Sequence, residues 1–152
     1  CLTKIKWGIW YILITDKTDK INKIIMKKIN KILIKGFHVI NCLLIIFYLF
    51  PGSILGYFLY NDFSIQPQIT EDFIISSNHF FAFTILSILG VISYQNTNKI
   101  NFIIKYLFTL SILLEFFHIL IPNRAFELGD LFGNVIGVVV VVILNEIIKK
   151  NE

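Results

Sequence analysis

The stretch LLEFFHILIPNRAFELGDLFGN, residues 113–134, places several ionisable and polar side chains inside an otherwise apolar part of the chain. Pro122 in its middle cannot donate a backbone hydrogen bond, so it ends a helix. The stretch therefore predicts the end of one helix, a short turn and the start of the next. Charged groups are costly in hydrocarbon, so their concentration here needs an explanation. They are Glu115, His118, Arg124, Glu127, Asp130 and Asn134.

Composition places the chain among integral membrane proteins. Its 152 residues are 56% hydrophobic, compared with about 45–50% in average soluble domains. The mean hydropathy is +0.75, and long apolar runs produce it. The length predicts a single domain. The two cysteines form no CxxC motif or Cys/His cluster that would indicate a structural metal.

Four apolar runs are long enough to cross a bilayer. Their lengths suit a hydrocarbon core of about 30 Å, which takes roughly 20 helical residues. Pro51-Gly52 ends the first run, and Ser76 and Ser77 are candidate N-caps for the second. The predicted fold class is all-α, a polytopic membrane protein with a bundle of four transmembrane helices. The runs are residues 32–50, 78–94, 100–121 and 129–148.

A basic segment precedes this bundle. The first 35 residues contain nine Lys and two Asp, a charge of +7. We divide the chain into a basic segment (1–31), a transmembrane domain (32–148) and a cytoplasmic tail (149–152). Residues 15–31 suit an amphipathic helix lying on anionic lipid head groups, and a solvated basic linker explains them equally well. The segment is short and no recognition motif follows it, which argues against nucleic acid as a partner.

Loop charges predict the orientation in the membrane. Residues 51–77 contain no Lys or Arg, whereas Lys99, Lys149 and Lys150 flank the opposite ends of the spans. The positive-inside rule therefore places both termini in the cytoplasm and residues 51–77 outside. Arg124 is the exception, a cation on the outer side.

The polar side chains converge on this predicted outer face. Glu115 and His118 share a helix face, as do Asp130 and Asn134. Glu115 lies about 10 Å below Pro122 at 1.5 Å per residue, so it must be paired or face a wet cavity. The second span starts with His79, and the fourth starts with Asp130 and Asn134. The third span ends with Glu115 and His118, and the turn after it carries Arg124.

A stripe of small residues lies beside the polar ones on the fourth span. Gly129, Gly133 and Gly137 form two overlapping GxxxG patterns. Small residues at this spacing let another helix approach closely. We interpret the stripe as a helix-packing surface flanked by Asp130 and Asn134.

The order of these residues resembles the VanZ-like family of small bacterial membrane proteins. That family has a histidine opening one span, as in NHFFAFTILSILG (78–90), then E-x-x-Q, a P-x-R loop and D-x-x-x-N-x-x-G. Over about residues 35–148 this chain has Glu115-Phe-Phe-His118, Pro122-Asn-Arg124 and Asp130-Leu-Phe-Gly-Asn134-Val-Ile-Gly137. His118 replaces the family's usual glutamine, and the Asp-Lys pair common before the histidine is absent. The resemblance implies a multi-pass protein of the bacterial cytoplasmic membrane with a cell-envelope role related to glycopeptide (teicoplanin) resistance.

The first functional hypothesis is a site for a lipid-linked or phosphate-bearing envelope molecule. Histidine and carboxylate side chains exchange protons when burial and pairing tune them, and a guanidinium binds phosphate with two parallel hydrogen bonds. A divalent metal is an alternative for these His and carboxylate side chains, but they lack a recognised ligand spacing, so neither a metal nor another cofactor is predicted. The catalytic candidates are His79, Glu115 and Asp130, and the ligand-binding candidates are His118, Arg124 and Asn134.

The second hypothesis is a non-catalytic membrane module. A closed network of Arg124, Glu115 and Asp130 would then fix the register of the helices, and a partner protein would carry the function. A channel or transporter is not favoured, because the inner halves of the spans hold little polarity and no broken repeat is visible.

Overall fold

The computed structural model of the chain describes residues 2–71 and 74–151, and the side chains of these from residue 18 onward. Within those ranges every regular element is helical. Four helical segments are long and apolar enough to cross a membrane, which confirms the predicted all-α bundle: Thr18–Leu49, Ser77–Tyr94, Ile100–Leu120 and Leu128–Lys150. The elements are α1 (Leu2–Leu49), α2 (Ile54–Tyr60), α3 (Ser77–Tyr94), α4 (Ile100–Phe117), the 3₁₀ turn η1 (His118–Leu120) and α5 (Leu128–Lys150).

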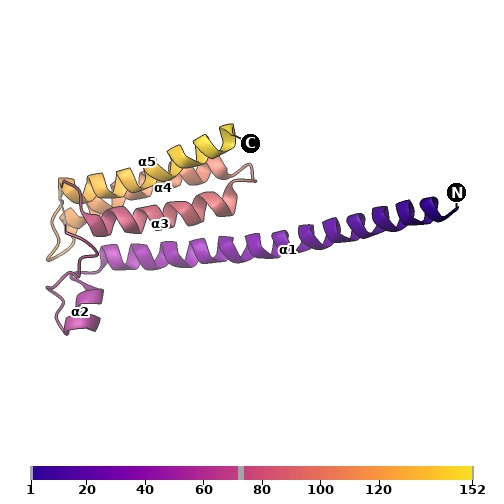
Figure 1. The fold of residues 1–152 in the computed structure, drawn as a ribbon. Helices are drawn as coiled ribbons and strands as arrows, with labels where there is room; N and C mark the ends of the chain where they lie inside the picture. The colour runs from indigo at the N-terminus through magenta and orange to yellow at the C-terminus, as the bar shows by residue number, and fades with distance from the viewer. Residues whose placement is uncertain (1, 72–73, 152) are drawn as a thin grey trace.

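The four long helices run side by side, up and down, and α2 lies at one end of the bundle (Figure 1). The two chain ends lie toward the other end, beyond which α1 projects (Figure 1). We call the first end the α2 end; it contains residues 50–71, 74–76 and 121–127. The two segments predicted to share one membrane face therefore lie together.

Helix α1 is continuous through the predicted boundary at residue 31. The chain has no proline before Pro51, so nothing interrupts the helical hydrogen bonds. Its 48 residues span about 70 Å at 1.5 Å per residue. Side chains 18–29 are exposed. The basic segment is thus an extension of the first span, and its contact with a membrane surface stays a prediction.

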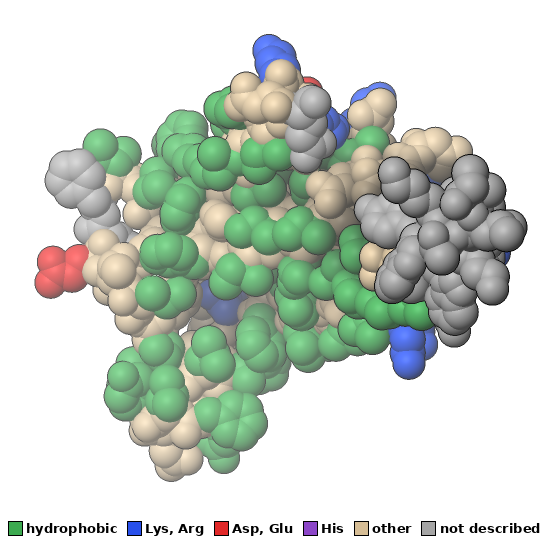
Figure 2. All heavy atoms as spheres, turned by 45° about the vertical axis from the view of Figure 1, so that its right-hand side comes forward, with side chains coloured by type: hydrophobic (Ala, Val, Ile, Leu, Met, Phe, Trp, Pro, Cys, Tyr) green, Lys and Arg blue, Asp and Glu red, His purple; other side chains and the backbone are tan. Residues whose placement is uncertain are grey.

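One face of α1 packs against the other helices. Phe37, Asn41, Leu44 and Tyr48 are buried, and their spacing of three to four residues places them on one helix face. The three apolar ones of these belong to a core that includes Phe83, Leu107 and Val138. Large apolar side chains cover the outward surfaces, as Figure 2 shows for one face. A membrane-spanning protein presents this surface to lipid.

Helix α5 approaches α3 at two glycines. A Cβ atom at Gly133 would lie 2.7 Å from the carbonyl oxygen of Ser76, and one at Gly137 would lie 2.7 Å from that of Phe80. Side chains at these positions would push the two backbones apart. Gly129 has more room, because a Cβ there would lie 3.7 Å from the nearest backbone oxygen.

Partly buried polar contacts also lie away from the α2 end. His38 Nε2 is 3.0 Å from Tyr94 Oη, and Asn41 Nδ2 donates to Tyr106 Oη at 2.7 Å. The expectation of almost purely apolar inner halves is wrong at these positions. His38 and Asn41 are three residues apart, a spacing that places them on neighbouring positions of one helix, and this was the signal in the sequence that could have revealed them.

Candidate functional site

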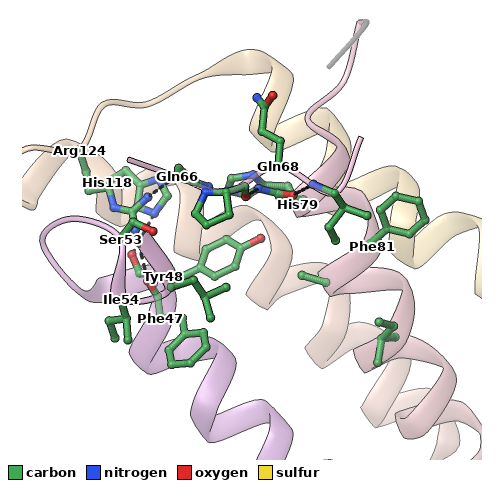
Figure 3. A pocket seen from close by; sticks show the side chains of 16 residues that line it. Phe47, Tyr48, Ser53, Ile54, Gln66, Gln68, His79, Phe81, His118 and Arg124 are labelled. Atoms are coloured by element: carbon green, nitrogen blue, oxygen red, sulfur yellow. Dashed lines mark hydrogen bonds between the residues drawn. The ribbon is translucent and has the colours of Figure 1, made fainter. Parts of the chain in front are cut away.

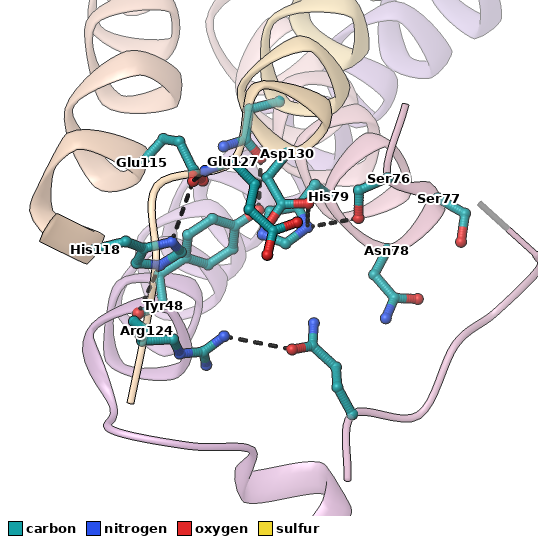
Figure 4. A network of polar contacts seen from close by, with 12 residues as sticks. Tyr48, Ser76, Ser77, Asn78, His79, Glu115, His118, Arg124, Glu127 and Asp130 are labelled. Atoms are coloured by element: carbon teal, nitrogen blue, oxygen red, sulfur yellow. Dashed lines mark hydrogen bonds and ion pairs between the residues drawn. The ribbon is translucent and has the colours of Figure 1, made fainter. Parts of the chain in front are cut away.

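The predicted polar side chains gather at the α2 end, inside the bundle (Figure 4). His79 comes from the first turn of α3, Glu115 from the last turn of α4, and Asn134 from the second turn of α5. Glu115 and Asn134 are each 0% exposed and His118 is 1% exposed. The helices thus enclose these groups and shield them from lipid.

Glu115 is held at one of its two oxygens. Its Oε1 accepts a hydrogen bond from the Glu127 amide at 3.0 Å and lies 3.4 Å from His118 Nδ1. His118 Nε2 lies 3.1 Å from the carbonyl oxygen of Tyr48, to which it can only donate. A second proton must therefore lie between Nδ1 and the carboxylate for these two groups to attract each other. Among the described residues, Glu115 Oε2 is buried and has no hydrogen-bond partner.

His79 forms a second pair with a carboxylate. Its Nδ1 lies 3.3 Å from Asp130 Oδ1 and 2.8 Å from Ser76 Oγ. Ser76 occupies the predicted N-cap position of α3, but its side chain makes no capping bond. It turns to the histidine instead. His79 thereby connects the start of α3 to the first turn of α5.

Tyr48 joins the cluster from α1. Its hydroxyl donates to Asn134 Oδ1 at 2.7 Å, and Asn134 Nδ2 donates to the carbonyl oxygen of Ser111 at 3.3 Å. The Tyr48 ring stacks on His118 and meets His79 edge-on. Residue type gave no reason to include Tyr48 among the site residues. Its position four residues after Leu44, on the buried face of α1, was the available signal.

Arg124 binds the C-terminal end of α1. Its Nη2 donates to the carbonyl oxygens of Gly52 at 2.7 Å and Phe47 at 3.3 Å, and its Nε donates to that of Phe50 at 3.3 Å. The last carbonyls of a helix lack partners within it and attract cations. Nη1 reaches Gln66 Oε1 at 3.4 Å. Arg124 therefore fastens the turn before α5 to the end of α1.

The charge of Arg124 reaches the cluster without a direct ion pair. Burial lowers the pKa of its guanidinium, and the negative charges of the Asp130 and Glu115 carboxylates act against that shift. The group stays cationic, since guanidinium keeps its proton in proteins. Among the described residues, Arg124 forms no ion pair with Glu115. The ion-paired network of the second hypothesis is therefore not closed at this point.

A cavity of about 320 Å³ opens beside the cluster, between the ends of α1 and α3 and the segment that carries α2 (Figure 3). Of the predicted site residues, His79, His118 and Arg124 line it, whereas Glu115, Asp130 and Asn134 lie behind them. Much of the cavity lining is apolar. Its apolar lining includes Phe47, Ile54, Leu55, Phe81, Ala82 and Ile85.

Three of the polar groups could hold a cation. His79, Glu115 and Asp130 each offer one ligand atom, and these atoms lie within 4.8 Å of one another. They come from three different helices. Their spacing in the sequence therefore resembles no local metal-binding motif, and only the fold brings them together.

No protein-family model, curated protein or solved structure matches this chain. The chemistry of the site therefore rests on its own geometry.

Proposed function

We propose that the chain is a VanZ-like protein of the bacterial cell envelope whose site binds an amphiphile with an anionic head, such as a lipid-linked phosphate. The cavity carries this proposal. Its walls are apolar where α1, α2 and α3 contribute Phe47, Ile54 and Ala82, and polar where His79 and Arg124 approach (Figure 3). A lipid chain and a charged head need this division of one pocket into two chemistries.

The polar end of the cavity has donors for an anion. Arg124 carries five N–H groups. Its four hydrogen bonds leave one of these on Nη1, beside the long contact to Gln66. A phosphate group displacing the Gln66 amide would have both Nη1 hydrogens available, one to each of two oxygens. His79 lies at the same cavity, so a protonated His79 imidazole can donate to the anion as well, whereas both nitrogens of His118 already face protein acceptors.

The two histidine–carboxylate pairs support proton exchange with a bound head group. His79 with Asp130 and His118 with Glu115 each join an imidazole to a carboxylate, the arrangement that general acid–base catalysis uses. Their rings are 6.5 Å apart between centroids. Binding of the amphiphile requires only the cavity and Arg124. Catalysis requires the two histidine–carboxylate pairs in addition.

A polyisoprenyl phosphate in detergent micelles tests the proposal. Its binding to the purified chain should exceed that of the matching polyisoprenol about tenfold, because charge-assisted hydrogen bonds to phosphate are worth at least about 1.4 kcal/mol. Native mass spectrometry measures both affinities. Inorganic phosphate without the lipid chain should bind more weakly than the polyisoprenyl phosphate.

A cavity-filling variant locates the binding. Ala82→Trp places an indole in the apolar part of the cavity, so the phosphate-bearing lipid should bind at least about tenfold more weakly. Ile92→Trp is the matched control, because Ile92 is an exposed residue of α3 that does not line the cavity. Equal affinities for both lipids, with no effect of Ala82→Trp, would remove the basis for a lipid site.

One observation favours the alternative of a non-catalytic module. Tyr48, Asn134 and the Ser111 carbonyl connect α1, α5 and α4 in one buried chain of hydrogen bonds, which suits a register-fixing role. Under this alternative, Ala82→Trp should still restore the cell-envelope phenotype of a strain that lacks the protein. Loss of the phenotype with Ala82→Trp at unchanged abundance in the membrane contradicts it.

We also propose that both termini lie in the cytoplasm and the α2 end lies outside. In a background of Cys1→Ser and Cys42→Ser, Glu71→Cys should react with a membrane-impermeant maleimide in intact cells. Asn98→Cys should react only after permeabilisation. Both positions are exposed and lie at opposite ends of α3. The reverse pattern of labelling would invert the orientation.

A further inference from the structure

We propose that His79, Glu115 and Asp130 form a binding site for one divalent transition-metal ion of the Zn²⁺ or Mn²⁺ type. The proposal goes beyond the amphiphile site and stands without it. The three ligand atoms lie within 4.8 Å of one another and are supplied by α3, α4 and α5. One imidazole and two carboxylates are a donor set that such ions accept.

The unpartnered oxygen of Glu115 points to a missing ligand. Its carboxylate is fully buried, and Oε1 is fixed by the Glu127 amide and by His118. Oε2 is enclosed and has no donor within the described part of the chain. Buried polar atoms are nearly always satisfied, and each exception calls for an ion, a water or a strained function. The groups on Oε1 orient the carboxylate as outer partners do for a metal ligand.

Charge balance favours a dication over a neutral occupant. Once the proton between Glu115 and His118 is released, two ionised carboxylates beside a neutral imidazole carry two negative charges inside the bundle, which is costly without compensation. Arg124 is near, but it directs its hydrogen bonds to carbonyls at and just beyond the end of α1 and to Gln66, and it forms no ion pair with Glu115. A divalent ion between the three ligands cancels the two charges directly.

The geometry requires modest closure. Two ligands of a tetrahedral zinc ion, each about 2.0–2.1 Å from it, lie about 3.3 Å apart. His79 Nδ1 and Asp130 Oδ1 already lie 3.3 Å apart. The widest separation, up to 4.8 Å, must shrink by about 1.5 Å to meet that value. The Asp130 side chain is 19% exposed and has room to turn, and the Ser76 hydroxyl must rotate away if Nδ1 is the ligand.

Three protein ligands leave one coordination position open. Catalytic zinc sites share this feature, whereas structural ones are closed by four ligands. His79 also lines the apolar-walled cavity. An ion on His79 therefore lies next to any molecule bound in the cavity.

Direct measurement of metal content tests the site. The protein is purified in detergent with a tag that contains no histidine, stripped with a chelator, and dialysed separately against Zn²⁺ and Mn²⁺. Elemental mass spectrometry should find about one metal ion per chain after dialysis against at least one of the two metals. Glu115→Gln and Asp130→Asn should each lower the retained metal at least about tenfold, since each removes a charged ligand.

Matched variants and a second readout distinguish ligation from loss of fold. Glu127→Gln removes a nearby carboxylate outside the ligand set, and His38→Gln removes a histidine far from it; both should retain the metal. Metal should raise the melting temperature of the unaltered chain but not of Asp130→Asn, which decides the question if Glu115→Gln fails to fold. Retention of under about a tenth of an ion per chain with both metals, or equal retention in all variants, overturns the proposal.

Discussion

Replacing Gly137 by alanine should lower the free energy of unfolding by about 2–3 kcal/mol, near the upper end of the usual cost of overpacking. The new Cβ would lie 2.7 Å from the carbonyl oxygen of Phe80 and 3.0 Å from the amide nitrogen of Thr84. Both are backbone atoms of α3, so no side-chain rotation relieves the contact. Leucine at this position should prevent the close packing of α3 and α5 altogether. Unfolding in mixed micelles, followed by circular dichroism, measures the loss.

Gly36→Ala is the control for this prediction. A Cβ at Gly36 meets nothing within 4 Å, yet it also lies within a helix. Alanine should favour the helix by about 1 kcal/mol at either position. The difference between the two variants therefore isolates the contact with α3. Equal stability of Gly36→Ala and Gly137→Ala would show that the two helices can separate without cost.

The helices were predictable because length and hydrophobicity determine them. Pro51 and Pro122 predicted the ends of α1 and α4, since proline and the residue before it disfavour a helical conformation. The end of α4 comes earlier than predicted, at Phe117, and the chain tightens into the 3₁₀ turn His118–Leu120 before Pro122. The composition of the chain changes at residue 31, whereas α1 runs through this position without a break.

The convergence of the polar residues was predictable, but their partners were not. Topology alone brings His79, Glu115 and Asp130 to one end of the bundle. Arg124 instead donates to backbone carbonyls at and just beyond the end of α1, and a sequence does not show which carbonyls lie near. The cavity depends on how α2 and the segment around Gln66 fold back over α1, a packing result with no local signature.

Arg124→Gln should lower the free energy of unfolding by about 2–3 kcal/mol, because hydrogen bonds from a charged donor are individually worth about 1.5–3 kcal/mol and Arg124 is only partly buried. Three carbonyl oxygens at the end of α1, those of Phe47, Phe50 and Gly52, would lose this donor. Thermal unfolding in micelles measures the change. The expected pattern is loosening of the α2 end with little loss of helix elsewhere.

Arg124→Lys separates the helix-capping role of Arg124 from binding of an anion. An ammonium is a single point charge and cannot span three carbonyls as a planar guanidinium does, so lysine should recover less than about half of the lost stability. A phosphate-bearing lipid would still meet a cation, and its affinity should fall by less than about tenfold. If Arg124→Lys kept wild-type stability but no longer bound the lipid, bidentate contact with the phosphate would matter more than the hydrogen bonds of Arg124 to the carbonyls at the end of α1. The carbonyl contacts favour the first pattern, because most of the guanidinium hydrogens already point toward α1.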